Sequence, residues 1–136
     1  MMLESALVAE LTKTGTTLYG LVGSRIYPLR LPQGATLPAI RYQRISTPRY
    51  HAMGGDSNLS SPRMQLDIFA ETYGSAKAVS EALRKKLQNF SGTMGTTSVN
   101  VSNVAVLLLD QSENTEEDTK HTRIRMDFSI YHDEST

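Results

Sequence analysis

Three histidines are the side chains best suited to acid–base chemistry or metal binding in this sequence: His51, His121 and His132. They show neither the close spacing typical of metal ligands nor a neighbouring pair of carboxylates. Cysteine is absent, which excludes thiolate catalysis, disulfides and cysteine-ligated zinc. We therefore interpret the histidines as surface residues, and we expect no catalytic residues, no metal and no cofactor.

Two glycine-containing segments, Met53–Asp56 and Gly92–Gly95, are the candidates for anion binding. Neither has the GxGxxG or GxxxxGK[ST] spacing that directs several backbone amides at one phosphate. We interpret both as turns, so the sequence does not indicate an enzyme.

The chain has 14 basic and 14 acidic residues in 136 positions, so its formal net charge is zero. Residues 1–70 carry 7 basic and 4 acidic residues, and residues 71–136 carry 7 and 10, which gives the two halves +3 and −3. A nucleic-acid-binding domain is usually more basic than this. Six of the seven early cations are arginine, which suits protein interfaces. The alternative is that these arginines lie on solvated strand faces.

The elements that position these residues follow from proline and from hydrophobic periodicity. Pro28, Pro32 and Pro38 exclude a helix from residues 25–38 and favour extended or turning backbone. After Pro38, the alternation of Ile40, Tyr42 and Arg44 with polar neighbours predicts a strand ending near residue 46.

Helical spacing appears in two segments, and a short helical turn is possible over residues 17–22. Residues 2–13 place their leucines on one side, which predicts an amphipathic helix. A second helix is predicted over residues 75–89, with Ser75 as its N-cap. Its predicted inner stripe is Ala76, Val79, Leu83, Lys86, Leu87 and Phe90.

Three further strands are predicted over residues 63–70, 99–109 and 123–132. In the strand over residues 99–109, the apolar residues change from odd-numbered to even-numbered positions. This change indicates a β-bulge near Ser102 and Asn103. The polar segments 47–61 and 110–120 show neither helical nor strand periodicity, so we expect mobile loops there. Each loop would connect the two strands of an antiparallel hairpin.

The fold class is therefore α+β, with a single mainly antiparallel sheet of four to five strands, two helices on one face and the order α-β-β-β-α-β-β. We expect one domain over residues 1–136. No secretion signal or membrane span is recognisable, so we expect synthesis in the cytoplasm. The other face of the sheet should be solvated or contact a partner. It carries Arg41, Gln43, Arg63, Gln65, Asp67, Arg123, Arg125 and Asp127.

The order and spacing of several short motifs resemble the tail completion, or tail terminator, family of long-tailed bacteriophages and prophages. The resemblance extends over nearly the whole chain. The motifs are Leu21-Val22-Gly23, Arg25-Ile26-Tyr27-Pro28, Pro32-Gln33-Gly34-Ala35, Leu37-Pro38-Ala39-Ile40, Tyr42-Gln43-Arg44-Ile45-Ser46, and Gln65-Leu66-Asp67-Ile68-Phe69-Ala70 followed by Tyr73.

This resemblance implies a structural subunit of the virion tail that is assembled in the bacterial host cytoplasm. Such a subunit forms a ring, typically a hexamer, which ends growth of the tail tube and meets the head connector. DNA would only pass through its channel, and no membrane is involved.

Within that assembly we expect two groups of residues to form contacts with neighbouring subunits or with the tail tube. The arginines would meet neighbouring subunits, and the acidic residues would face the channel or the adjoining tube. The expected residues are Arg41, Arg44, Arg49, Glu113, Glu116, Glu117 and Asp118.

Two other functions stay open at this point. The chain could be a head–tail adaptor or a minor tail subunit of the same particle. It could also be an unrelated α+β enzyme or ligand-binding module, which a deep pocket with convergent polar groups would favour.

Overall fold

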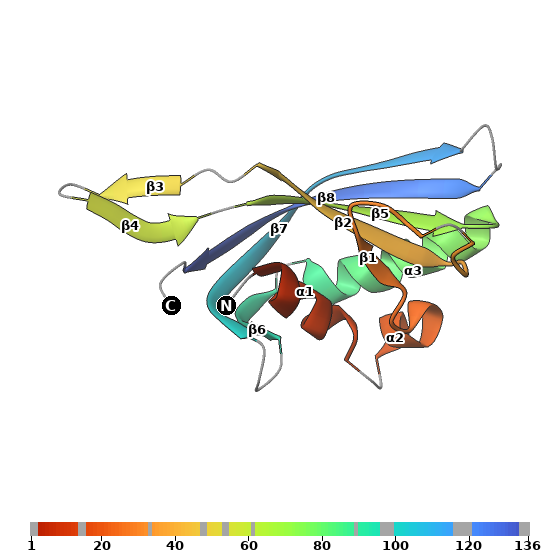
Figure 1. Ribbon diagram of the computed structural model, residues 1–136, viewed down its shortest axis with the longest axis horizontal. Coiled ribbons are helices and arrows are strands. Elements are labelled where there is room, and N and C mark those ends of the chain that lie inside the picture. Colours follow the sequence, from red (N-terminus) through yellow and green to blue (C-terminus); the bar gives the residue numbers. More distant parts are fainter. Residues whose placement is uncertain are drawn as a thin grey trace.

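The computed structural model describes residues 3–13, 16–32, 34–46, 49–52, 55–60, 62–88, 90–95, 100–115 and 121–133, and their side chains except those of 46, 49–60, 100–103 and 133. The helices lie on one side of a curled sheet (Figure 1). The helices are α1 (Leu3–Leu11), α2 (Thr17–Val22) and α3 (Tyr73–Leu87). The strands are β1 (Ile26–Pro28), β2 (Ala39–Ser46), β3 (Arg49–Ala52), β4 (Gly55–Ser60), β5 (Arg63–Ala70), β6 (Ser91–Gly95), β7 (Asn100–Thr115) and β8 (Thr122–Asp133).

The main sheet has the strand order β1-β2-β5-β8-β7-β6. β1 runs parallel to β2, whereas the other neighbours are antiparallel, so the sheet is mixed. The α+β class and the pairing of both long hairpins are confirmed. The expected four to five strands and two helices were too few, because α2, β3, β4 and β6 are short elements formed from polar or glycine-containing sequence.

The segment expected to be an irregular loop over residues 47–61 contains the antiparallel strands β3 and β4. This hairpin extends away from the main sheet (Figure 1). Its β4 strand continues the ladder along β8, pairing Leu59 with Asp133 and Ser60 with His132. The expectation of irregular structure was wrong because strand pairing, rather than hydrophobic alternation, organises this segment.

The strand expected over residues 99–109 runs to Thr115, so half of the loop expected at 110–120 is also a strand. Its polar end is held by pairing with β8 from Asp110↔Asp127 to Thr115↔Thr122. The expected bulge is confirmed by the register of β6 and β7. Met94 pairs with Val101 and Gly92 pairs with Val104, so β7 has one extra residue between these two pairs. A second register shift places an extra residue at Leu109.

The predicted cap of the long helix was wrong by one turn. α3 begins at Tyr73, and the Thr72 hydroxyl accepts a hydrogen bond of 3.1 Å from the backbone N–H of Ser75. Thr72 has extended backbone angles, as an N-cap residue requires. The sequence offered two hydroxyl residues three positions apart, and the backbone geometry selects the first.

One hydrophobic core lies between the helices and the sheet. The α3 residues Val79, Leu83 and Leu87 are fully buried, as predicted. The inward positions of β5 and β8 are buried as their alternation predicts: Met64, Leu66, Ile68, Ala70, Ile124, Met126, Phe128 and Ile130. No helix in the described part of the chain is long and apolar enough to cross a membrane.

Glu10 of α1 is a buried carboxylate that connects three elements. It forms ion pairs of 3.0 Å with Lys13 and with Lys86 of α3, and it accepts a hydrogen bond of 3.0 Å from the Gly95 N–H of β6. Burial alone would raise the pKa of Glu10, but the Gly95 hydrogen bond and the two lysines outweigh it and lower this pKa below its ordinary value. The charged form of Glu10 therefore stabilises the packing of α1 against α3 and β6.

Candidate interaction surface

The face of the sheet opposite the helices, called here the outer face, is formed by residues that alternate with core positions on β2, β5, β8 and β7. The strand registers align these residues in rows across the sheet. One row contains Arg41, Asp67, Arg125 and Ser112. The next row contains Gln43, Gln65, Asp127 and Asp110.

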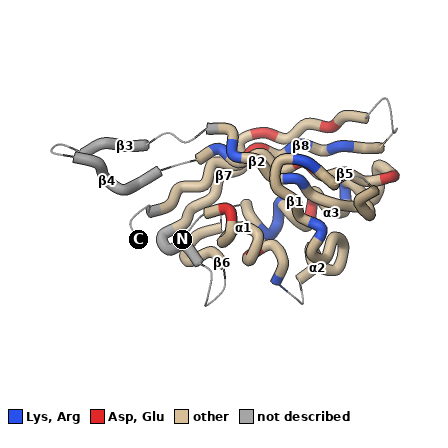
Figure 2. The backbone as a smooth tube through the Cα atoms, in the orientation of Figure 1, with Lys and Arg blue, Asp and Glu red and all other residues tan. Residues whose placement is uncertain are grey.

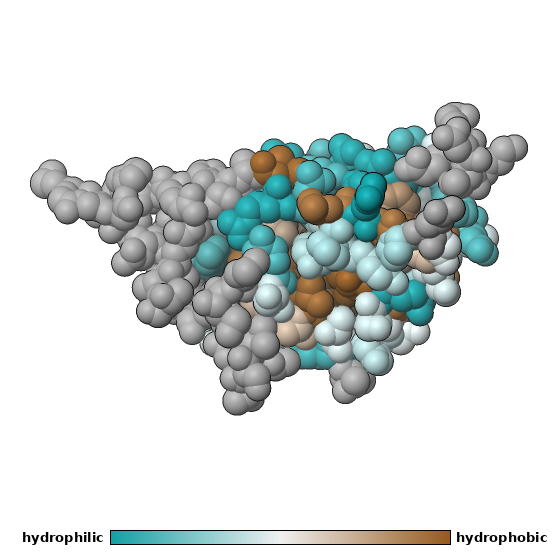
Figure 3. All heavy atoms as spheres, in the orientation of Figure 1, coloured by the Kyte–Doolittle hydropathy of each residue, from teal (hydrophilic) through white to brown (hydrophobic). Residues whose placement is uncertain are grey.

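The tube view shows blue positions gathered on the strands of the sheet, including β2 and β8 (Figure 2). In the space-filling view, the upper margin of the described surface, where the sheet lies, is mainly hydrophilic (Figure 3). The outer face is thus a charged surface on a regular scaffold, as the alternation of β5 and β8 predicted.

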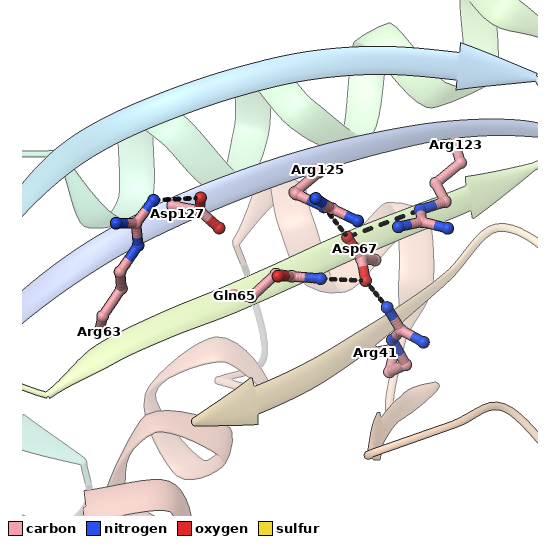
Figure 4. Close-up of polar contacts among 7 residues, drawn as sticks. All are labelled: Arg41, Arg63, Gln65, Asp67, Arg123, Arg125 and Asp127. Carbon is pink, nitrogen blue, oxygen red and sulfur yellow. Dashed lines mark hydrogen bonds and ion pairs between the residues drawn. The ribbon is translucent and has the colours of Figure 1, made fainter. Parts of the chain in front are cut away.

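Asp67 lies at the centre of the outer face and is fully buried. Its Oδ2 accepts hydrogen bonds from Arg41 Nη2 and, at 2.9 Å, from Gln65 Nε2 (Figure 4). Its Oδ1 lies 3.8 Å from Arg123 Nε and 3.6 Å from Arg125 Nε. A buried carboxylate is tolerated only when it is paired in this way, so Asp67 holds the three guanidinium groups around itself.

The ring of Phe69 supports two of these arginines. The Arg41 and Arg123 guanidinium carbons lie 5.8 and 5.9 Å from the ring centroid. At these distances the positive groups are attracted to the aromatic face, which further restricts their side chains. The cluster of Arg41, Arg123 and Arg125 around Asp67 and Phe69 is called the arginine cluster below.

A second ion pair lies beside the arginine cluster. Arg63 Nη2 of β5 donates a hydrogen bond of 2.8 Å to Oδ2 of Asp127, a nearly buried residue of β8 (Figure 4). Asp127 also lies directly across from Asp110 of β7, which is exposed. This part of the outer face is therefore more acidic than the arginine cluster.

Half-exposed aliphatic residues accompany these charges. Leu107 is 49% exposed and faces outward beside Ser129, while Leu109 is 48% exposed at the second bulge of β7. Ile45 is 47% exposed at the register shift of β2. Arginine combined with exposed aliphatic residues is typical of protein interfaces more than of solvated sheet faces.

The expected interface arginines occupy different surroundings. Arg41 belongs to the arginine cluster. Arg44 lies on the helix side of β2, where its Nη2 forms an ion pair of 2.9 Å with Glu4 of α1. Both arginines were expected at one interface, but alternation along β2 places them on opposite faces of the sheet.

Glu113 points toward the helices, not outward. Its carboxylate lies 2.9 Å from Lys77 Nζ and accepts a hydrogen bond of 3.1 Å from the Tyr73 hydroxyl, both at the start of α3. The hydrogen bond from Lys77 lowers the pKa of Glu113 below its usual value. Glu113 therefore attaches the end of β7 to α3, and not the expected tube or channel surface to a partner.

The remaining expected interface residues are not tested by the structure. The Arg49 side chain lies outside the described residues, as do Glu116, Glu117 and Asp118. Arg123 and Arg125 were not among the expected interface residues, although their alternation in β8 places them on the outer face.

Within the described residues, no group of three or more histidine, cysteine, aspartate or glutamate side chains could hold a metal ion. A groove of about 400 Å³ lies between the start of α2 and the outer side of α3, and Glu81, Lys85 and Lys86 contribute to its lining. It lies on the helix side of the molecule, away from the arginine cluster.

Comparisons with known proteins give two matches of different kinds. A family model described as "Tail completion protein gp17" matches residues 5–133. A solved structure described as "Virion of native gene transfer agent (GTA) particle" matches with a TM-score of 0.64 and 16% identity, covering 95% of this chain and 93% of that chain. A comparison with curated proteins gave no match.

The structural match shows a shared fold, since its sequence identity is low. The family match covers nearly the whole chain, including every described helix and strand except the first two residues of α1. The chain belongs to the tail completion protein gp17 family, and it is a structural protein of a phage tail.

Proposed function

We propose that this chain is a tail terminator, which occupies the head-proximal end of the tail tube and ends its growth. The observation that carries the proposal is the family match over residues 5–133. The fold shared with a chain of a gene transfer agent particle is consistent with a place in a virion.

The two sides of the molecule support this proposal physically. A tail tube is a stack of identical rings, so its last ring exposes the same association surface as every earlier ring. A terminator must bind that surface with one side and must not bind further tube subunits with its other side. In this chain the helices cover one face of the sheet, whereas the other carries the arginine cluster with Leu107 and Leu109. The two sides are unlike, as a terminator requires.

The partners follow from this position. Copies of the chain would form a ring, most simply a hexamer matching the symmetry of a tail tube, between the tube protein and the head–tail connector. DNA would pass through the ring without being its specific ligand. The hairpin of β3 and β4 extends from the body and offers backbone edges for a neighbouring chain.

Deletion of the gene from the parent phage tests this function. We expect headless tails, many of abnormal length, beside DNA-filled heads that lack tails, all visible by electron microscopy. Expression of the intact chain from a plasmid should restore normal particles.

Other phenotypes would replace the terminator by a neighbouring role. Tails of normal length that still fail to join heads would indicate a head–tail adaptor. Tails of normal length joined to heads would indicate a minor tail subunit.

A further inference from the structure

Leu29, which directly follows β1, has an unfavourable backbone conformation and is strongly exposed. Its φ is +64°, in the left-handed region that favours glycine. The residue is 66% exposed, the largest fraction among the large hydrophobic residues that the structure describes. The Arg30 N–H donates a hydrogen bond of 2.7 Å to the Pro28 carbonyl, which closes a γ-turn around Leu29. A glycine would adopt this turn without strain, so the leucine indicates a surface that another protein covers.

The turn is held firmly in place. Pro28 has a restricted φ of its own, and the Leu29 N–H donates a hydrogen bond of 2.9 Å to the Tyr42 carbonyl of β2. β1 is the terminal strand of the main sheet, so the turn lies at the sheet edge. Leu29 and Arg30, called here the Leu29 turn, thus present one apolar and one positive side chain from ordered backbone. Such order lowers the entropic cost of binding.

The opposite edge of the sheet is open along the second half of β7. β6 pairs with β7 only as far as Ala105. Beyond Ala105, β8 is the only strand that pairs with β7 in the part of the chain that the structure describes (Figure 1). This open segment carries Leu107 and Leu109, which are 49% and 48% exposed, and then exposed Asp110. An open strand edge with exposed aliphatic side chains favours contact with another chain.

The two edges carry complementary pairs of residues. Leu29 is followed by Arg30, and Leu109 is followed by Asp110. Both charged residues are exposed, and neither forms an ion pair with a residue that the structure describes. The Asp110 carboxylate accepts a hydrogen bond of 2.9 Å from the adjacent Gln111 N–H, which leaves its second oxygen available. The two pairs therefore match in both apolar character and charge.

The strand registers place these pairs at the same level of the sheet. The pairing of β1 with β2 puts Leu29 level with Gln43. The row that contains Gln43 ends at Asp110 on β7. Four strand spacings, about 19 Å along the sheet, separate the two pairs, which is too far for contact within one copy. Two copies placed edge to edge would bring the pairs together without a shift along the strands.

We propose that the Leu29 turn of one copy docks against Leu107, Leu109 and Asp110 at the open edge of β7 in the neighbouring copy. Leu29 packs on the two leucines, and Arg30 pairs with Asp110. The two patches differ and lie at opposite edges of one sheet, so the contact is head-to-tail and each copy uses both patches. A head-to-tail contact gives a ring when the rotation between copies closes, and in this respect the inference rests on the proposed function.

Leu29→Gly separates a role in the interface from a role in the fold. Glycine adopts a φ of +64° freely, so the urea midpoint of the free subunit should be unchanged or higher. The concentration needed for half-assembly should rise by roughly tenfold or more, because the apolar contact is lost. Analytical ultracentrifugation measures assembly, with purified tail tubes added where the free chain stays monomeric.

Charge reversal tests the pairing of Arg30 with Asp110. Arg30→Glu and Asp110→Lys should each raise the concentration needed for half-assembly by roughly threefold to tenfold. A chain that carries both reversals should assemble nearly as well as wild type, because every contact again joins opposite charges. Lys85→Glu, the same kind of reversal at an exposed position of α3, is the matched control and should assemble normally.

Cross-linking identifies the two surfaces that meet. The native chain has no cysteine, so a short bis-maleimide can join Leu29→Cys in one copy only to Leu109→Cys in another. The expected product is a covalent dimer from the mixed variants. Each variant alone should give little dimer, and so should Lys85→Cys mixed with Leu109→Cys.

The outcomes are distinct. A lowered urea midpoint for Leu29→Gly would assign Leu29 to the fold, and normal assembly of that variant would remove it from the interface; either result overturns this contact. Failure of the double reversal to assemble, without a mixed dimer, would assign Arg30 to the tube protein or the connector. A dimer from Leu29→Cys alone would replace the head-to-tail contact by a two-fold one and overturn the proposal.

These results would leave the terminator function standing. Wild-type protein that forms no ring even with tubes would overturn the proposed function itself.

Discussion

Asp67 of β5 lies directly across from Arg125 of β8, with Asp67 Oδ1 3.6 Å from Arg125 Nε, although the two residues are 58 positions apart. The aspartate is fully buried, whereas the arginine is 44% exposed. The aspartate therefore lies beneath the sheet surface, and the arginine carries its charge at that surface.

Replacing Asp67 with asparagine should destabilise the fold, because three guanidinium groups would lose their shared counter-charge. We expect a loss of about 1 to 3 kcal/mol, less than for a fully buried ion pair because the arginines keep part of their hydration. Urea unfolding measures the loss. Asp110→Asn, on the same face but exposed, is the control, and an equal midpoint for both variants would contradict the role assigned to Asp67.

Truncation of Leu83 to alanine tests the packing of α3 on the sheet. Leu83 is fully buried, and such truncations cost about 2 to 5 kcal/mol. Leu109→Ala, at a half-exposed position, should cost less than about 1 kcal/mol. An unchanged urea midpoint for Leu83→Ala would show that α3 does not pack as described.

The cap of α3 can be identified by comparing two hydroxyl residues. Thr72→Ala removes the hydrogen bond to the Ser75 N–H and should cost about 1 kcal/mol. Ser75→Ala should change stability by less than about 0.5 kcal/mol, because its side chain does not cap the helix. Thermal unfolding by circular dichroism distinguishes the two, and the reverse order would restore Ser75 as the cap.

Acid should weaken the packing of α1 through Glu10. Folding lowers the pKa of this group, so its stabilising effect is present above the pKa of the unfolded chain, about 4.3, and is lost as the pH falls through the lower folded value. Glu10→Gln should lose about 1 to 3 kcal/mol at pH 7 and show a shallower loss of stability below pH of about 4. Urea unfolding from pH 7 to pH 3 measures the free energy of unfolding at each pH. Exposed Glu71→Gln serves as the control. If this free energy fell as steeply with pH in Glu10→Gln as in wild type, Glu10 would not be the source of the acid sensitivity.

The β3–β4 hairpin should exchange its amide hydrogens quickly in the isolated subunit and slowly after assembly. Among the residues that the structure describes, it pairs outside its own ladder only through two residues of β4 with the end of β8. An isolated two-stranded hairpin is marginally stable in water. Hydrogen exchange with mass spectrometry compares the free chain with the chain bound to tail tubes. Strong protection already in the free subunit would contradict an ordering role in assembly.

The sequence by itself determined the core faces of the long elements. Strict alternation in residues 63–70 and 123–132 identified which side chains enter the core, because side chains of a strand point to opposite faces with a period of two. The change of parity near Ser102 likewise located the first bulge of β7. These features depend on residues close together in the chain.

Tertiary structure alone decided the features that depend on pairing between distant segments. The polar segments Gly55–Ser60 and Asp110–Thr115 are strands because they lie beside β8, which supplies hydrogen bonds without any apolar pattern. Arg41, Asp67 and Arg125 meet because of the registers of β2, β5 and β8, and a shift of one residue would turn the side chains of the shifted strand to the other face. Alternation placed these three residues on one face, but register is set by packing across the whole sheet, so only the tertiary structure makes them neighbours.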